Sequence, residues 1–441
     1  MKEFNLEQEY HEMNMEGLMD IEGGVLKRCA VDFQQIDDHA RMISIPEGVS
    51  SIERGAFDEY NSGENSKGIA YILSHRDYYL NENRKQVNRR QPVKIYYPEG
   101  VSTITDKAAY MLDRDMDVRL MELSFPASLE KVAEGALPVY LKAINVHEEN
   151  EVFKSVDGVL FSKDGKKLIK FPGYNSFMDY SIPEDVEEIA AQAFNNAAVN
   201  KLTIPGTIRK VPAGCFRNSV IEELEICEGT EEIGEEAFEG SRIKEIRLPS
   251  TLRKIGSFAF RGCTAIKSIN CESEDLQIGK GLFCEGKYDD ISWWCWEEIP
   301  KAAFLNADIK KIEIPKGVEA IGEYAFAGCY TARRVSLPES VKVINPHSFD
   351  LGPTWNRPVT LPRSLYHYLY RFPACITVDR KFRSELWEKR ENKDFAEDPE
   401  VLLEQKKAIE DYLPKLRVMQ FTEKNELKKQ LQQIGLMMNN S

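Results

Sequence analysis

The chain has 441 residues, and its 42 % apolar and 10 % aromatic content is enough to fill a hydrophobic core. The formal net charge of −14 argues against a nucleic-acid binder, which needs a basic surface. The sequence contains no apolar run of about eighteen residues that would span a membrane. Composition therefore indicates a folded, soluble protein.

Residues 1–57 are predicted to hold an N-terminal segment, a capping β-hairpin and a first repeat. The opening stretch MKEFNLEQEYHEMNMEG has glutamates where a secretory signal needs basic residues and an apolar core. We therefore expect the protein in the cytoplasm, with surface exposure by another route left open. Gly23 and Gly24 break any preceding helix, and the pattern after them indicates a hairpin that covers the first repeat.

Residues 58–94 interrupt the repeat pattern and are predicted to be an insertion. Five cations gather there on an otherwise acidic chain: Arg76, Arg84, Lys85, Arg89 and Arg90. A solvated loop and a docking site are both compatible with this basic patch.

Residues 95–379 are predicted to be an array of repeats of about 22 residues, which stack into a solenoid. In the unit LTIPGTIRKVPAGCF, Leu202 and Ile204 mark a short strand, and Pro205 ends it because proline has no N–H to donate to a strand ladder. Eight phenylalanines, each five residues after an isoleucine or valine, mark the period: Phe194, Phe216, Phe238, Phe260, Phe283, Phe304, Phe326 and Phe349.

Two segments depart from this repeat. Near residues 152–172, apolar and polar residues alternate on both sides of Asp164-Gly165, a strong turn signal, so we expect a two-stranded β-hairpin insert. Residues 380–441 are rich in helix formers, and Asp398-Pro399 is a sound helix start. This last stretch is predicted to be a small α-helical module.

Two stretches have a recognisable pattern, IPKGVEAIGEYAFAGC at residues 314–329 and DGVLFSKDGKKLIKFP at residues 157–172. Both resemble the BspA-like leucine-rich repeat proteins. The resemblance covers about residues 22–378 and implies an α/β, β-rich, right-handed leucine-rich-repeat solenoid with one short parallel strand per coil. It carries no catalytic residue. Members of the family are typically exported and are discussed as adhesins, whereas this sequence shows no signal or anchor.

Signatures of catalysis and of cofactor binding are missing from the sequence. It has no P-loop motif, no dinucleotide-binding glycine fingerprint, no HExxH motif and no GxSxG elbow, and its histidines are scattered. We therefore predict no catalytic residue, cofactor, metal site or small-molecule substrate. Cys263 and Cys329, each three residues after a phenylalanine, are expected to be buried free thiols.

The candidate binding residues lie between the two inward side chains of each predicted strand, so they must point out of the sheet. They form a ladder of mixed charge and small polar groups, which suits contact with an extended polar surface of a protein partner. A merely solvated face is the alternative. The residues of this row are Thr203, Glu225, Arg247, Asn270, Ser292, Glu313 and Ser336.

A tryptophan cluster breaks the polar pattern in a coil that is one residue short. Aligning that coil on Ile299 and Phe304 puts Trp293 and Trp296 in the core and Trp294 where proline normally stands. We expect Trp294 to be partly exposed and to be a binding hot spot, with compensatory packing as the alternative.

The sequence thus predicts a non-enzymatic scaffold that binds a protein partner through the outward strand face. One alternative is a bacterial surface or host-interaction protein. Another is an enzyme with an unrecognised site in the insertion or the C-terminal module. No histidine or cysteine follows Cys375, which argues against the enzyme.

Overall fold

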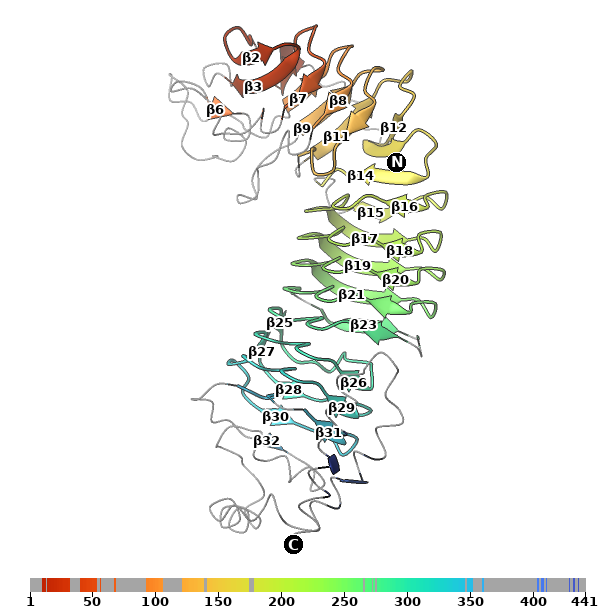
Figure 1. Cartoon of the computed structure of the whole chain (residues 1–441), viewed down its shortest axis with the longest axis vertical. Coiled ribbons are helices and arrows are strands. Elements are labelled where there is room, and N and C mark those ends of the chain that lie inside the picture. The colour runs from red at the N-terminus through yellow and green to blue at the C-terminus, as the bar shows by residue number, and fades with distance from the viewer. Residues whose placement is uncertain are drawn as a thin grey trace. The chain divides into compact units, whose positions relative to one another are not determined.

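The computed structural model describes residues 14–31, 40–53, 93–105, 121–138, 141–173, 178–264, 266–271, 276–345 and 347–351, and a few shorter pieces outside these ranges. By its internal contacts the chain divides into two compact units, Met1–Glu231 and Glu232–Ser441. Each unit is built of coils with short, mostly parallel strands (Figure 1), which confirms the predicted β-rich, right-handed solenoid.

The first unit begins with a group of coils, here called the N-terminal stack, that supply strands to two sheets. Gly23 and Gly24, with φ of 57° and 78°, join β2 (Met19–Glu22) to β3 (Val25–Val31) as an antiparallel pair, so the predicted N-terminal hairpin is present. One sheet is parallel throughout, in the order β1 (Tyr10–Glu12), β4 (Ala40–Ser44), β7 (Val93–Tyr96), β9 (Met121–Phe125) and β11 (Leu141–Val146). The other runs β2 (Met19–Glu22), β3 (Val25–Val31), β5 (Ser51–Ile52), β8 (Thr103–Ile104) and β10 (Lys131–Val132), with β6 (Lys67–Gly68) also beside β3.

The predicted hairpin insert is present, with one strand more than expected. Strands β12 (Phe153–Val156), β13 (Val159–Ser162) and β14 (Lys167–Lys170) are antiparallel, and β14 pairs in parallel with β16 (Glu188–Ile189). The two-stranded prediction is wrong because a second Asp-Gly turn adds β12. Asp157 and Gly158 have φ of 50° and 79°, the backbone that a tight hairpin turn requires.

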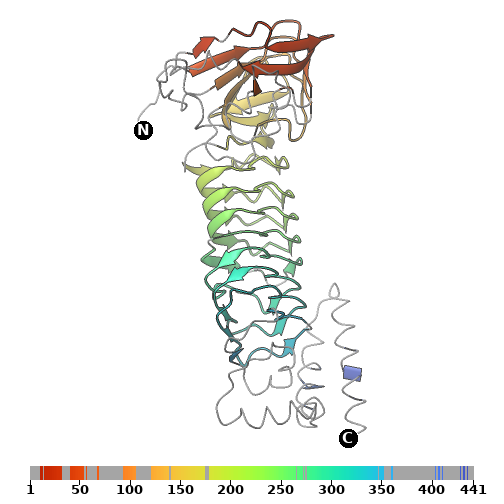
Figure 2. The ribbon, with the colours of Figure 1, turned by 90° about the vertical axis from the view of Figure 1, so that its left-hand side faces the viewer.

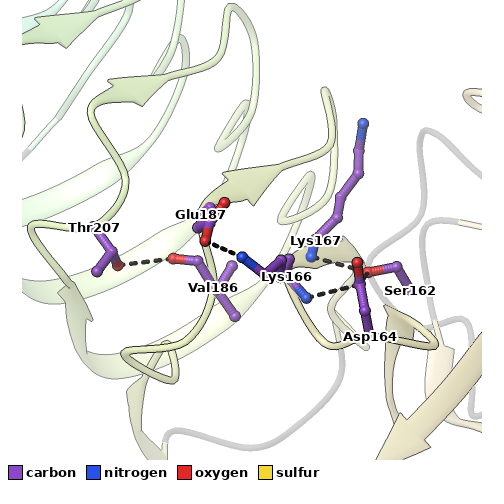
Figure 3. Close-up of polar contacts among 7 residues, drawn as sticks. All are labelled: Ser162, Asp164, Lys166, Lys167, Val186, Glu187 and Thr207. Carbon is purple, nitrogen blue, oxygen red and sulfur yellow. Dashed lines mark hydrogen bonds and ion pairs between the residues drawn. The ribbon is translucent and has the colours of Figure 1, made fainter.

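Polar side chains hold the β13–β14 turn and join it to the following coil (Figure 3). Ser162 Oγ donates to Asp164 Oδ1 at 2.6 Å, and the Lys166 backbone N–H donates to the same oxygen at 3.0 Å. These hydrogen bonds, led by that of Ser162, lower the pKa of Asp164 from its usual value. The ammonium of Lys166 forms an ion pair with Glu187, and Thr207 Oγ1, one coil further, donates to Val186 O at 2.7 Å.

The rest of the first unit repeats one coil geometry. Side chains at the five predicted core places Leu202, Ile204, Ile208, Val211 and Phe216 are fully buried. Figure 2 shows these coils, in yellow-green, lying one on another with the long strands along one edge. Strands β15 (Met178–Ser181), β17 (Ala198–Ile204) and β19 (Val220–Ile226) are parallel, and β18 (Lys210–Val211) is the short strand of one coil. Strand β17 ends directly before the proline that was predicted to end it.

The second unit continues the same coil type with shorter strands. Two of its sheets contain β21 (Arg242–Leu248) with β23 (Ser268–Cys271), and β20 (Glu232–Ile233) with β22 (Lys254–Ile255) and β24 (Gln277–Ile278). A third sheet pairs β25 (Lys287–Tyr288) with β27 (Asp308–Ile309). A fourth contains β26 (Glu298–Ile299), β29 (Ala320–Ile321) and β31 (Val343–Ile344). A fifth contains β28 (Ile312–Glu313), β30 (Val335–Ser336) and β32 (Val359–Thr360). All of these pairs are parallel.

A column of phenylalanine rings forms the centre of the second unit and is here called the phenylalanine ladder. The rings of Phe238 and Phe260 stack at 5.2 Å and 5°, and those of Phe304 and Phe326 at 5.2 Å and 3°. The backbone N–H of each of these four donates to a carbonyl of the next coil, for example Phe304 to Ala325 at 2.8 Å. The 22-residue period is thus the distance along the chain between stacked rings.

Seven of the eight phenylalanine turns, all except that of Phe349, contain two residues in the left-handed backbone region. Around Phe304 they are Ala302, with φ of 55°, and Asn306, with φ of 57°. Around Phe326 they are Tyr324, with φ of 57°, and Gly328, with φ of 75°. Alanine and tyrosine adopt this region only at a cost of roughly 1–2 kcal/mol, so the stacked coils impose the turn geometry on whatever residue stands there.

Some predicted segments lie largely outside the described residues. In the insertion at 58–94 only Lys67–Gly68 and the start of β7 are described. In the C-terminal module only scattered residues such as Leu403, Lys406–Lys407 and Glu410 are described, each helical. The module and the predicted domain boundaries stay predictions. Within the described residues, no helix is both long and apolar enough to cross a membrane.

Candidate binding face

In the first unit, the outward residues of neighbouring strands are aligned by the strand register. Thr203 of β17 is the direct partner of Glu225 of β19, and Lys201 is the partner of Glu223. Lys201 Nζ reaches diagonally to Glu225 Oε2 at 2.7 Å, with both side chains about one-third exposed. The outward face of these coils therefore carries paired charges.

In the second unit the same position forms two further short rows. Arg247 of β21 is aligned with Asn270 of β23, and both are exposed. Glu313 of β28 is aligned with Ser336 of β30, and Glu313 forms an ion pair with Arg334. The structure thus aligns these predicted residues in pairs, while their role in binding stays a prediction.

Ser292 is not in a strand, contrary to the prediction. It lies in a turn where Asp290 Oδ1 accepts hydrogen bonds from the Ser292 backbone N–H at 3.0 Å and from its hydroxyl at 2.6 Å. The strand of this coil comes earlier, at β25, where Tyr288 supplies the buried ring. Counting backwards from Ile299 misplaces the strand because the turn between them is irregular.

Trp294 is 4 % exposed, so its predicted exposure is wrong. Its ring centroid lies 5.4 Å from that of Phe304 and 6.0 Å from that of Phe283. Its indole N–H donates to the Trp296 carbonyl at 2.9 Å, so the polar group of the Trp294 side chain is paired despite its burial. Trp293 and Trp296, predicted as core, are only half-buried.

The N-terminal stack has an outward row that the sequence interpretation missed. Ser44 of β4, Tyr96 of β7 and Ser124 of β9 are register partners in turn, and Asn145 of β11 is the next partner of Ser124. Tyr96 is 45 % exposed, an unusual value for a large ring on a strand. The signal was available, because the first three of these residues stand two places before a proline, as Thr203 does.

Buried thiols and one buried amine lie behind these faces. Burial raises the pKa of Cys29 and of Cys329 to about 12, so both thiols stay protonated at neutral pH. Cys263 and Cys329 are fully buried and free, as predicted. Lys170 is 7 % exposed, and its burial lowers its pKa to about 8.

Within the described part of the chain, no three His, Cys, Asp or Glu side chains are grouped as ligands of a metal ion would be. Cys271 and Cys295, both free, are less buried than Cys263, Cys284 and Cys329.

Comparison with known proteins gives a family match and several similar structures. The model of the BspA type leucine rich repeat region matches residues 169–291 and 297–368, with six copies. A leucine-rich repeat protein from Eubacterium ventriosum is similar at 18 % identity over 72 % of this chain and 80 % of that chain, with a TM-score of 0.40. A leucine-rich repeat protein from Bacteroides ovatus is similar at 17 % identity over 86 % and 93 %, with a TM-score of 0.36. The pneumococcal vaccine antigen PcpA is similar at 18 % identity over 86 % and 91 %, with a TM-score of 0.35. No curated protein matches the chain.

Proposed function

From the premise that the chain belongs to the BspA-type leucine-rich repeat family through residues 169–291 and 297–368, we propose that it is a non-enzymatic scaffold for a protein partner. The observation that carries this proposal is the contrast between the inward and the outward side chains of each strand. Inward residues such as Leu224 and Ile246 are buried, and the outward residues between them vary in charge. An array that repeats its core and varies its surface suits the recognition of an extended partner.

The outward face contacts the partner through its charges. Glu225, Arg247 and Glu313 are the charged members of the predicted row. Reversing them inverts the electrostatic pattern of the face, and like charges brought together across an interface cost several kcal/mol. The fold tolerates the change, because ion pairs at such partly exposed positions contribute about 0–1 kcal/mol each.

The test is affinity capture from the native organism with the immobilised full chain. A triple variant carries Glu225→Lys, Arg247→Glu and Glu313→Lys. A matched variant with the same net charge change carries Glu184→Lys, Arg253→Glu and Glu339→Lys, at exposed positions in the turns. We expect the wild type and the matched variant to enrich the same protein and the triple variant to lose it. Equal enrichment by all three would contradict the role of the strand face.

The place of the protein in the cell is tested by fractionation of the native host. Recovery in the cytoplasmic fraction supports an internal scaffold. Recovery in washed surface extracts supports the alternative of a surface or host-interaction protein.

A further inference from the structure

The N-terminal stack presents an exposed ring in a row of uncharged polar side chains. Tyr96 is flanked by Ser44 on one side and by Ser124 and Asn145 on the other, in continuous register across β4, β7, β9 and β11. Of these, β7, β9 and β11 can be followed side by side in Figure 1. Neighbouring strands lie ~4.8 Å apart, so the four side chains form a line of roughly 14 Å.

The hydrogen bonds of this row come from its backbone and not from its side chains, as far as the structure describes the chain. Within the described part of the chain, none of the side chains of Ser44, Tyr96, Ser124 and Asn145 has a hydrogen-bond partner. The next outward row of the same sheet differs, because Glu122 there is paired with Lys142 at 2.7 Å. The ion pair of Glu122 and Lys142 beside the row is thus formed within the protein, while the row itself offers two hydroxyls, an amide and a phenol to a ligand.

The ring is held on a rigid base. The Tyr96 carbonyl accepts a hydrogen bond from the Ile45 N–H at 3.1 Å, and the next residue, Tyr97, is buried and donates its N–H to the Ser124 carbonyl at 3.0 Å. Tyr97 packs edge to face on Phe125, with ring centroids 5.3 Å apart. Because the backbone that presents Tyr96 is already fixed in this way, binding there requires little further ordering of the backbone.

We propose that this row, Ser44-Tyr96-Ser124-Asn145, is a binding site for an extended neutral polysaccharide. A sugar ring has an apolar C–H face, which stacks on an aromatic ring, and a rim of hydroxyls that both donate and accept hydrogen bonds. Tyr96 supplies the ring, and the serine hydroxyls and the Asn145 amide supply donors and acceptors along one line. A charged partner gains nothing from a row without charge, which is why the ligand is neutral. This site is separate from the charged row proposed to contact a protein.

The test is affinity electrophoresis of the full chain in native gels that contain one polysaccharide each. The neutral probes are soluble starch, mixed-linkage β-glucan, xyloglucan and galactomannan, and the anionic probe is polygalacturonate. We expect retardation by at least one neutral probe. Tyr96→Ala should weaken that binding about tenfold or more, Asn145→Ala should weaken it less, and Tyr96→Phe should keep most of it.

Tyr330→Ala is the matched control, because Tyr330 is also an exposed tyrosine, at 68 %, but lies in a turn of the other unit. Tyr330→Ala should bind the polysaccharide as the wild type does. The triple charge-reversal variant should also bind it, because a loss of protein capture in that variant concerns only the scaffold proposal. Circular dichroism and thermal unfolding verify that each variant is folded. Absence of retardation by all neutral probes, retardation by polygalacturonate alone, or undiminished binding by Tyr96→Ala would each overturn the proposal. Capture of a protein, rather than a glycan, through Tyr96 would overturn it as well.

Discussion

Among the described residues of the N-terminal stack, one ring contact joins neighbouring coils, that of Tyr97 with Phe125 at 5.3 Å and 67°. In the phenylalanine ladder every coil stacks a ring on the next, from Phe238 to Phe349. The stack is filled instead by aliphatic side chains such as Leu26, Ile43 and Leu123. The same coil geometry is therefore reached with two kinds of core. A core of one repeated ring gives interchangeable coils, whereas a mixed core depends on individual residues.

The largest expected change in stability comes from removing one ring from the phenylalanine ladder. Phe260→Ala removes a ring that stacks at 5.2 Å on Phe238 and at 5.4 Å on Phe283. We expect the free energy of unfolding to fall by about 3–5 kcal/mol, measured by urea denaturation. Phe258→Ala is the control in the same turn, because Phe258 is half-buried, and it should cost much less. Equal losses in the two variants would mean that ring stacking does not stabilise the ladder.

The corresponding test for the first unit removes a single buried polar side chain, that of Asn150. Asn150 is fully buried, and its Nδ2 donates to Pro126 O at 2.9 Å and to Leu129 O at 2.8 Å. Its Oδ1 accepts from the backbone N–H groups of Val152 at 2.9 Å and Phe153 at 2.7 Å. It thereby joins the last turn of the N-terminal stack to the hairpin insert.

Asn150→Ala leaves these backbone groups buried without partners, so we expect a loss of about 2–4 kcal/mol in the same urea measurement. Asn145→Ala, at an exposed asparagine of β11, should leave stability unchanged within about 0.5 kcal/mol. A similar small change for Asn150→Ala would show that the mixed core does not depend on this contact.

A third test concerns the buried amine of the hairpin insert. Lys170 Nζ has one weak hydrogen bond, to Gln192 O at 3.5 Å, and burial lowers its pKa to about 8 from an ordinary value of 10.5. Between these pH values the unfolded chain binds a proton that the folded chain does not, so stability rises with pH through this window. Below about pH 8 the amine is charged in the folded chain as well, so the full cost of burying that charge lowers the stability of the fold.

Lys170→Met removes the titrating amine and keeps most of the side-chain volume. We expect the variant to be more stable than the wild type at pH 7, and the difference to shrink by on the order of 1–3 kcal/mol as the pH rises to ~10.5. Urea denaturation across this range measures the difference. The titration of buried thiols remote from Lys170, such as Cys29 and Cys329, cancels because both proteins contain them. A difference that stays constant with pH would contradict the lowered pKa.

The smallest expected effect is at an ion pair between coils of the second unit. Lys254 Nζ lies 2.8 Å from Glu232 Oε1, and the lysine side chain is 55 % exposed. Lys254→Met should lower stability by about 0–1 kcal/mol at low salt, and the loss should fade at ~1 M NaCl because salt screens exposed charges. Lys316→Met, at an exposed turn lysine, should have no effect at either salt concentration. A larger, salt-independent loss would mean that Lys254 acts through packing.

The sequence was a good guide wherever the 22-residue period holds. The five core places from Leu202 to Phe216 and the strand end before Pro205 follow from apolar spacing and from proline's missing donor, which are local properties. The prediction from sequence was wrong between Tyr288 and Ile299, where the coil is irregular. Both Ser292 and Trp294 were placed by counting across that turn, and only the folded chain shows that Tyr288 fills the core and that Trp294 is covered.

Where the 22-residue period holds, the sequence by itself determined which side chains face inward, because a repeated period fixes the direction of each residue in its coil. Only the tertiary structure decided the state of the outward side chains. Lys201 pairs with Glu225 one coil away, whereas Tyr96 stays exposed among neutral neighbours at the equivalent place. Such pairing depends on strand register and on the reach of side chains some 22 residues apart, and no local pattern encodes it. The residues that carry both proposed binding sites belong to this second class.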